Sequence, residues 1–240
     1  MVVRHSFVFF FISLMSLALT GYALASGTVS GTIKFDGKAP HFRAIPMDAD
    51  PICLSLHKEI VLPQTIVLGN GNTLGNVFVY VKSGLTQTDF PIPSEPIVID
   101  QKGCNYFPHV LGIRVNQKVR ILNPDGTLHN VHAMTKVNEE FNMAMPQFRK
   151  EAEKIFNKPE FMFALKCDVH PWMGAWIAVM SHPYFTVTQT DGKFEIKGLP
   201  NGTYEIEAWH EKLGTKTATI TITDGATQTS DFTFAAPSQS

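Results

Sequence analysis

Residues 167–173 read CDVHPWM and place three metal-binding side chains at intervals of three residues, namely Cys167, His170 and Met173. Apolar runs at 161–166 and 176–180 flank this stretch, and we expect both to be strands. A tight loop between two strands can bring all three side chains to one point. Thiolate and imidazole select copper or zinc, and a weakly bound thioether favours copper. The stretch therefore predicts a copper site at the turn between two strands.

A further strong ligand is expected upstream, in the sequence NPDGTLHNVH at 123–132. His129 follows a predicted strand at 119–122 and would lie on the loop after it. His132 is the rival candidate, three positions further on. Two imidazoles, one thiolate and a long axial thioether form the type 1 copper arrangement.

The rest of the chain alternates apolar and polar residues, as half-buried strands do. Dipeptides that favour tight turns, Asp-Gly and Asn-Gly, separate these runs. The alternating runs lie at 29–35, 77–81, 113–121, 194–196, 204–208 and 218–222. Residues 149–156 could form a short helix or an exposed strand. The sequence predicts an all-β fold, of the sandwich type.

Two resemblances to known families follow from these motifs. HNVH at 129–132 together with CDVHPWM resembles the cupredoxins, and most closely the amicyanin type. FTVTQTDGKFEIKGLPNGTYEIEAWH at 185–210 resembles the carboxypeptidase regulatory-like domain, and GTVSGTIKFDGKAP at 27–40 resembles the strand that opens that domain. The whole chain is similar to methylamine-utilisation-type proteins, which join the two.

These resemblances imply two β-sandwiches. A cupredoxin-like Greek-key sandwich would occupy 96–182. It would be inserted into a smaller immunoglobulin/prealbumin-like sandwich made of 26–95 and 183–235, followed by a tail at 236–240. Proline-rich residues 90–96 and His182-Pro183 are consistent with these boundaries.

The cupredoxin resemblance also implies roles for individual residues around one type 1 copper. The implied copper ligands are His129, Cys167, His170 and Met173. Asn130 would tie the two ligand loops together, and His132 would not bind copper. His170, with Pro171 and Trp172, would form an exposed apolar patch through which electrons pass.

Two further cysteines, Cys53 and Cys104, leave alternatives open. They could form a disulfide, since an exported protein meets an oxidising environment. They could instead form a second metal site with His57 and His109, because the spacings Cys-x3-His and Cys-x4-His permit it.

The N-terminus has the features of a cleaved signal peptide at 1–25. Arg4 precedes an apolar run at 7–19, and Ala23-Leu24-Ala25 is a small-x-small cleavage site. A retained anchor is the alternative. We expect a mature chain that starts near Ser26, has no membrane span and resides in the periplasm. The net charge of -1, with charged residues at 17%, gives no sign of nucleic-acid binding.

The predicted function is one-electron transfer between redox partner proteins, without enzymatic turnover. No nucleophilic triad or carboxylate pair is apparent in the sequence. One alternative is a periplasmic copper chaperone or storage protein, which the additional Met143 and Met145 would support. Another is a structural binding module in which the metal is incidental.

Overall fold

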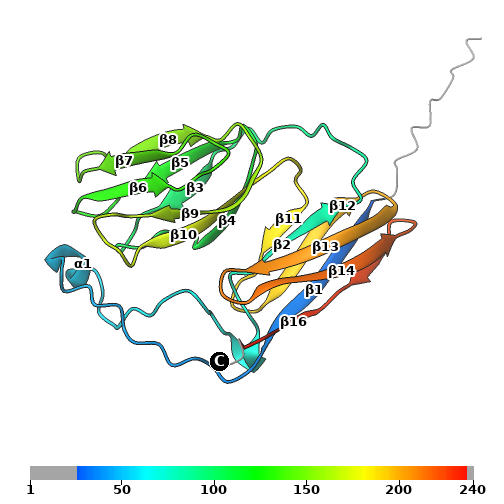
Figure 1. Ribbon diagram of the computed structural model, residues 1–240, viewed down its shortest axis with the longest axis horizontal. Coiled ribbons are helices and arrows are strands. Elements are labelled where there is room, and N and C mark those ends of the chain that lie inside the picture. The colour runs from blue at the N-terminus through cyan, green and yellow to red at the C-terminus, as the bar shows by residue number, and fades with distance from the viewer. Residues whose placement is uncertain (1–25, 237–240) are drawn as a thin grey trace, which may run out of the picture.

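The computed structural model describes residues 26–236, which form two β-sheet units side by side (Figure 1). Apart from the short helix α1 (Pro51–Ser55) and a 3-10 turn, η1 (Asn70–Asn72), the regular structure is β. The predicted all-β class is therefore confirmed. The predicted signal peptide and the end of the tail, 237–240, lie outside the described residues. Among the described residues, no helix is long and apolar enough to cross a membrane.

The first unit, here called the terminal unit, takes its strands from both ends of the described chain. One of its sheets contains β1 (Gly27–Asp36), β12 (Lys193–Leu199), β15 (Thr227–Thr229) and β16 (Phe232–Ala235). The other contains β2 (Phe78–Ser83), β11 (Phe185–Val187), β13 (Gly202–His210) and β14 (Gly214–Ile222). Alternate residues such as Val29 and Ile33 of β1 are fully buried in its core, as the period of two requires. The first strand and the last strands thus belong to one unit.

The second unit, the central unit, is built from the strands between β2 and β11. One sheet has the order β4 (Val110–Arg114), β10 (Gly174–Met180), β9 (Glu160–Lys166), β6 (His129–Ala133), β7 (Phe141–Met145), and the other the order β3 (Ile97–Asp100), β5 (Lys118–Leu122), β8 (Glu151–Ile155). Ile113, Ile121 and Ile177 are among the buried residues of its core. The stretch for which the sequence left helix or strand open is β8.

The two units pack together through the second face of β2. Val79 and Val81 lie in the core of the terminal unit, whereas Phe78 points to the opposite face and joins a separate cluster with residues of β4 and β10. The Phe78 and Phe185 rings stack at 5.5 Å. A Cβ at Gly112 would lie 2.5–2.6 Å from atoms of these two rings. The close approach of the units therefore requires glycine at this position.

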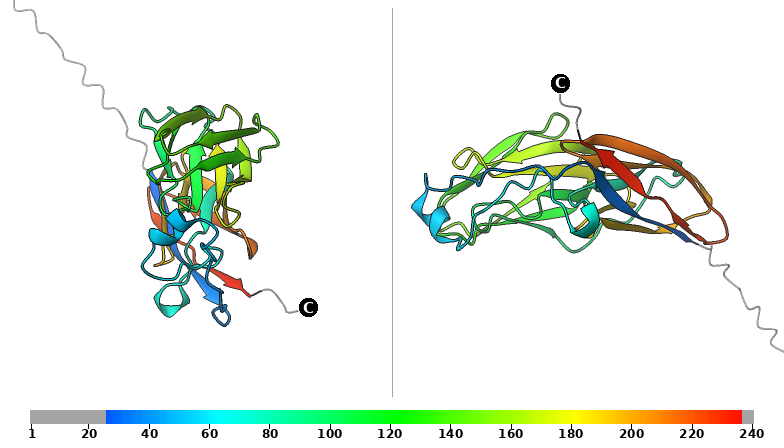
Figure 2. Two further views of the ribbon diagram at one scale, coloured as in Figure 1. Left: turned by 90° about the vertical axis from the view of Figure 1, so that its left-hand side faces the viewer. Right: turned by 90° about the horizontal axis from the view of Figure 1, so that it is seen from below.

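The long connection between β1 and β2 leaves the terminal unit and covers one end of the central unit. Residues 44–62 of this connection, here called the cap, contain α1, which lies at one end of the elongated molecule (Figure 2). Met47 and Cys53 of the cap are buried in the central core. The sequence-based division assigned this segment to the terminal unit and gave no sign that it would pack on the central unit.

Candidate metal centre

The secondary structure explains how two distant loops meet. His129 is the first residue of β6, and Cys167 directly follows β9, the neighbour of β6 in the sheet. The loop from Cys167 to Met173 is closed by backbone hydrogen bonds, from Met173 N to the His170 carbonyl (2.9 Å) and from Cys167 N to the Met173 carbonyl (3.3 Å). Strand pairing and a tight turn therefore hold both loops at one end of the sheet.

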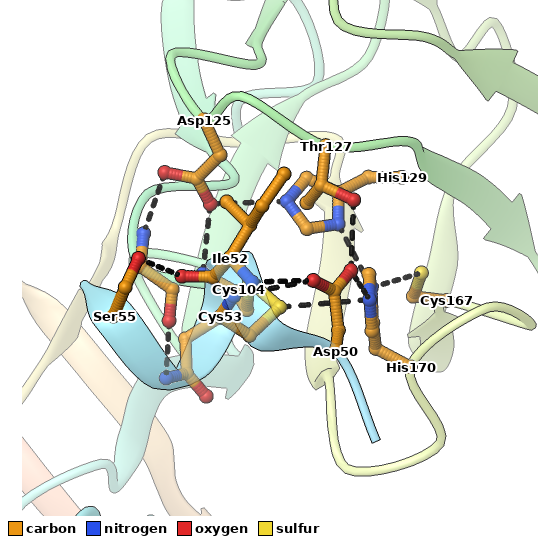
Figure 3. The surroundings of a disulfide bond; sticks show 12 residues. Asp50, Ile52, Cys53, Ser55, Cys104, Asp125, Thr127, His129, Cys167 and His170 are labelled. Carbon is orange, nitrogen blue, oxygen red and sulfur yellow. Dashed lines mark hydrogen bonds and ion pairs between the residues drawn. A yellow bond between two sulfur atoms is a disulfide. The ribbon is translucent and has the colours of Figure 1, made fainter. Parts of the chain in front are cut away.

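Three of the four predicted ligands converge (Figure 3). The Nδ1 atoms of His129 and His170 lie 3.0 Å apart, and Cys167 Sγ is 3.8 Å from His170 Nδ1. One donor atom from each residue lies within 4.8 Å of the others. All three side chains are at most 2% exposed. Met173 is buried in the same core cluster as Cys167.

Carboxylates hold the outer nitrogens of both histidines. His129 Nε2 lies 3.0 Å from Asp125 Oδ2, and His170 Nε2 lies 3.0 Å from Asp50 Oδ2. A carboxylate on one imidazole nitrogen orients the ring and leaves the other nitrogen free to bind a metal. Neither carboxylate was predicted from the sequence. The only signal for Asp125 was its position four residues before His129, and Asp50 had none.

Asn130 connects the two ligand loops. Its Oδ1 accepts hydrogen bonds from the Asp168 backbone N–H (2.7 Å), the Val169 N–H (3.3 Å) and Cys167 Sγ (3.3 Å). Its Nδ2 donates to Asn142 Oδ1 at 2.6 Å. One buried amide thus holds the thiol and the turn that follows it.

In the metal-free site, hydrogen bonds outweigh burial in setting the pKa values of His129 and Cys167. Burial lowers the pKa of His129, but hydrogen bonds with Asp125 and Cys167 outweigh burial and raise that pKa to about 9. Burial raises the pKa of the Cys167 thiol, but hydrogen bonds from His129 and the surrounding backbone outweigh it and lower the pKa. Since a metal binds the thiolate and the neutral imidazole, it would displace the proton held by His129.

Cys53 and Cys104 form a disulfide, the first of the two alternatives (Figure 3). The second alternative, a metal site with His57 and His109, is wrong. His57 Nε2 lies 2.8 Å from the Gly103 carbonyl. His109 lies between the Gly174 carbonyl (Nδ1, 3.0 Å) and Glu211 (Nε2, 2.5 Å).

The expected exposure of His170 is also wrong. The cap covers this ring: Asp50 contacts its Nε2, and Cys53 Sγ lies 3.5 Å from the same atom. Trp172 is half-buried, with its ring centroid 5.1 Å from that of His170. Pro171 remains exposed. The short motif could not reveal this covering, because it comes from a segment more than a hundred residues earlier in the chain.

His132, the rival ligand, points away from the cluster. Its Nδ1 and Nε2 lie 3.2 Å from Asp168 Oδ1 and 3.0 Å from Glu140 Oε1, respectively. Hydrogen bonds to both carboxylates raise its pKa. His132 therefore lies in a surface ion-pair network.

The donor set fits copper. Two imidazole nitrogens and one thiolate suit both Cu(II) and Cu(I), and a nearby thioether favours copper over zinc. Both rings are already oriented by carboxylates, and the thiol is fixed by Asn130. Little rearrangement of these side chains would be needed to hold the ion.

Comparisons with known proteins give one family match and several matches to solved structures, each over part of the chain. Residues 170–235 match the family model of the carboxypeptidase regulatory-like domain. A solved structure of an amicyanin mutant in its Cu(I) form matches at 19% identity and a TM-score of 0.33, over 42% of this chain and 98% of that one. A purple cupredoxin from Nitrosopumilus maritimus matches at 21% identity and a TM-score of 0.30, over 35% of this chain and 99% of that one.

A Cu-containing nitrite reductase, NirK, from Thermus scotoductus SA-01 matches at 20% identity and a TM-score of 0.34, over 42% of this chain. The match spans only 26% of the reductase. No curated protein matches the sequence. The resemblance to the carboxypeptidase regulatory-like domain is therefore confirmed over residues 170–235, and solved cupredoxin structures match part of the chain.

Proposed function

We propose that this protein is an exported type 1 copper protein that carries one electron at a time between redox partners. The proposed copper ligands are His129, Cys167, His170 and Met173. The observation that carries the proposal is the convergence of three buried side chains: the Nδ1 atoms of His129 and His170 lie 3.0 Å apart, and Cys167 Sγ lies 3.8 Å from His170 Nδ1.

The copper would supply the exchange of one electron between its Cu(II) and Cu(I) states. The chain's own part is to keep the ligands in place during that exchange. Asp125 and Asp50 hold the outer nitrogens of the two histidines, and Asn130 holds the thiol. A centre whose ligands are fixed by their neighbours needs little rearrangement for each electron.

Burial of the ligands supports electron transfer rather than turnover or delivery. His129, Cys167 and His170 are all enclosed, so a small substrate has little access to them. A copper chaperone, by contrast, needs an exposed ligand set for rapid transfer. We therefore propose a redox partner protein, and neither a substrate nor a copper acceptor, for the disulfide-bonded form. Residues 1–25 support export to the periplasm.

The visible spectrum of the purified protein with one equivalent of Cu(II) tests this proposal. An intense thiolate-to-copper band is expected in the wild type and in His132→Ala, the matched control for a histidine outside the cluster. The band should be absent in Cys167→Ala and strongly changed in His129→Ala. Voltammetry should show a reversible one-electron couple. A colourless wild type that nevertheless binds Cu(I) would refute the proposal.

A further inference from the structure

The Cys53–Cys104 disulfide lies against the outer side of both copper-binding histidines. Cys53 Sγ is 3.5 Å from His170 Nε2, whereas Cys167 approaches the other nitrogen of the same ring. The sulfurs of Cys53 and Cys104 and a His170 nitrogen lie within 4.8 Å of one another. A second such group joins Cys104 to Asp125 and His129. Figure 3 shows the disulfide on the cap side of the histidine pair.

In the disulfide form, this outer group lacks thiolates, which are the form of cysteine that binds metals. Both sulfurs are fully buried, and so are the inner ligands. Cys53 and Asp50 of the cap both lie at the Nε2 side of His170. The disulfide therefore covers one side of the inner ligands.

We propose that reduction of the Cys53–Cys104 disulfide creates a second copper site, in which the two thiolates and His170 bind Cu(I). This outer site would receive copper and pass it to the inner ligands. An exported disulfide-containing protein would then oxidise Cys53 and Cys104 back to the disulfide by thiol–disulfide exchange, its own disulfide being reduced to two thiols. The proposed function does not use Cys53 or Cys104. It does use His170, and Asp50 would have to release the Nε2 atom of that ring to the outer site. Only the transfer to the inner ligands depends on that function.

The chemistry balances with an exported dithiol protein as the reductant. The donor's two thiols become its disulfide, the bond between Cys53 and Cys104 breaks, and two hydrogens pass to the freed sulfurs. Cu(I) then displaces the two thiol protons and forms two Cu–S bonds. Copper keeps its oxidation state throughout. Two thiolates and an imidazole are soft donors that suit Cu(I).

Reduction of the disulfide would remove the covalent link between the cap and the central unit. Helix α1 has only five residues, and Ile52 and Leu54 on either side of Cys53 are 40% and 55% exposed. Besides Cys53, the cap packs on the central core through the buried Met47 and the partly buried Ile45 and Val61. The reduced cap would therefore stay docked most of the time through these non-covalent contacts and would open transiently.

Cu(I) titration of Cys167→Ala, which lacks the inner thiolate, tests the proposal. The same protein is compared in its disulfide form and after phosphine reduction and anaerobic removal of the reductant, with bicinchoninate as the competing chelator. The reduced form should bind one equivalent of Cu(I) roughly a thousandfold more tightly than the disulfide form. Bound Cu(I) should also protect both thiols from alkylation. His170→Ala in the reduced Cys167→Ala background should lower the affinity by roughly tenfold or more.

Equal Cu(I) affinity of the two forms would overturn the outer site, and so would unchanged affinity after His170→Ala. A reduced form that retains Zn(II) in preference to Cu(I) would overturn the choice of metal. Circular dichroism follows the fold in each state, and loss of the strand signal on reduction would also count against the proposal. The wild-type visible spectrum plays no part here, so this test and that of the proposed function fail independently.

Discussion

Reduction of the Cys53–Cys104 disulfide should lower the free energy of unfolding by about 4 kcal/mol. The two cysteines are 51 residues apart in the chain. The loop-closure relation for a loop of this length gives about 14 cal/mol/K of denatured-state entropy, or about 4 kcal/mol at 25 °C. Small domains are stable by about 5–15 kcal/mol, so the reduced protein should still fold. The cap would then remain docked most of the time but without its cross-link.

Guanidinium unfolding of metal-free Cys167→Ala, oxidised and reduced, measures this difference without a third thiol that could exchange. Tryptophan fluorescence is the probe, because the Trp172 ring packs on His170 beneath the cap. If the free energy of unfolding falls by about 4 kcal/mol for each molar of guanidinium, the unfolding midpoint of the reduced protein should be lower by about 1 M. The same reductant should not shift the midpoint of the triple variant in which Cys53 and Cys104 are also alanine. A loss below about 1 kcal/mol at unchanged slope would refute the loop-closure reasoning.

Three further predictions concern the polar groups around the ligands. Asn130→Ala should lower the free energy of unfolding by about 2–3 kcal/mol, measured by denaturant titration, because buried donors lose their acceptor. Burial lowers the pKa of His129, but hydrogen bonds with Asp125 and Cys167 outweigh burial and raise that pKa to about 9 in the metal-free protein. This raised pKa stabilises the fold fully below the unfolded value near 6.5, and the contribution is lost as the pH rises through 9. The wild-type free energy of unfolding should therefore decline between pH 7 and 9.5, and that of His129→Gln should not show this decline. Asp50→Asn should weaken Cu(II) binding roughly 10- to 100-fold in chelator competition, whereas Asp48→Asn, an exposed carboxylate nearby, should not.

The fold class was predictable because strand signals are local. Alternation in 29–35 and 204–208 places one face of each strand in the core, and Asp-Gly and Asn-Gly turns mark the ends of strands. The packing of the two units was not predictable. It depends on β2 presenting Val79 to one core and Phe78 to another cluster, whereas the predicted alternation of Val77, Val79 and Val81 identified only one buried face of this strand.

The candidate metal centre, too, was only partly predictable from the sequence. The spacing of Cys167, His170 and Met173 is contained in one loop, so the sequence reveals it directly. His129 reaches the site because β6 pairs with β9. Its position directly after a predicted strand was the sequence signal for this placement. Asp50, however, reaches His170 across 120 residues of sequence. No periodicity in the sequence connects positions so far apart. Asp50 is also the N-cap of α1, and an aspartate before a short helix indicates only that role.

The position of the cap changes where a redox partner would have to dock. If His170 were exposed, a partner could approach its ring directly, but Asp50 and Cys53 occupy that side. Trp172 offers another route, because its ring lies 5.1 Å from that of His170 and is half-exposed beside the exposed Pro171. Its indole Nε1 donates to the Cys104 carbonyl at 3.1 Å, which fixes the ring relative to the disulfide. We therefore expect electrons to leave through the Pro171–Trp172 side of the loop, with the disulfide holding the conducting ring in place.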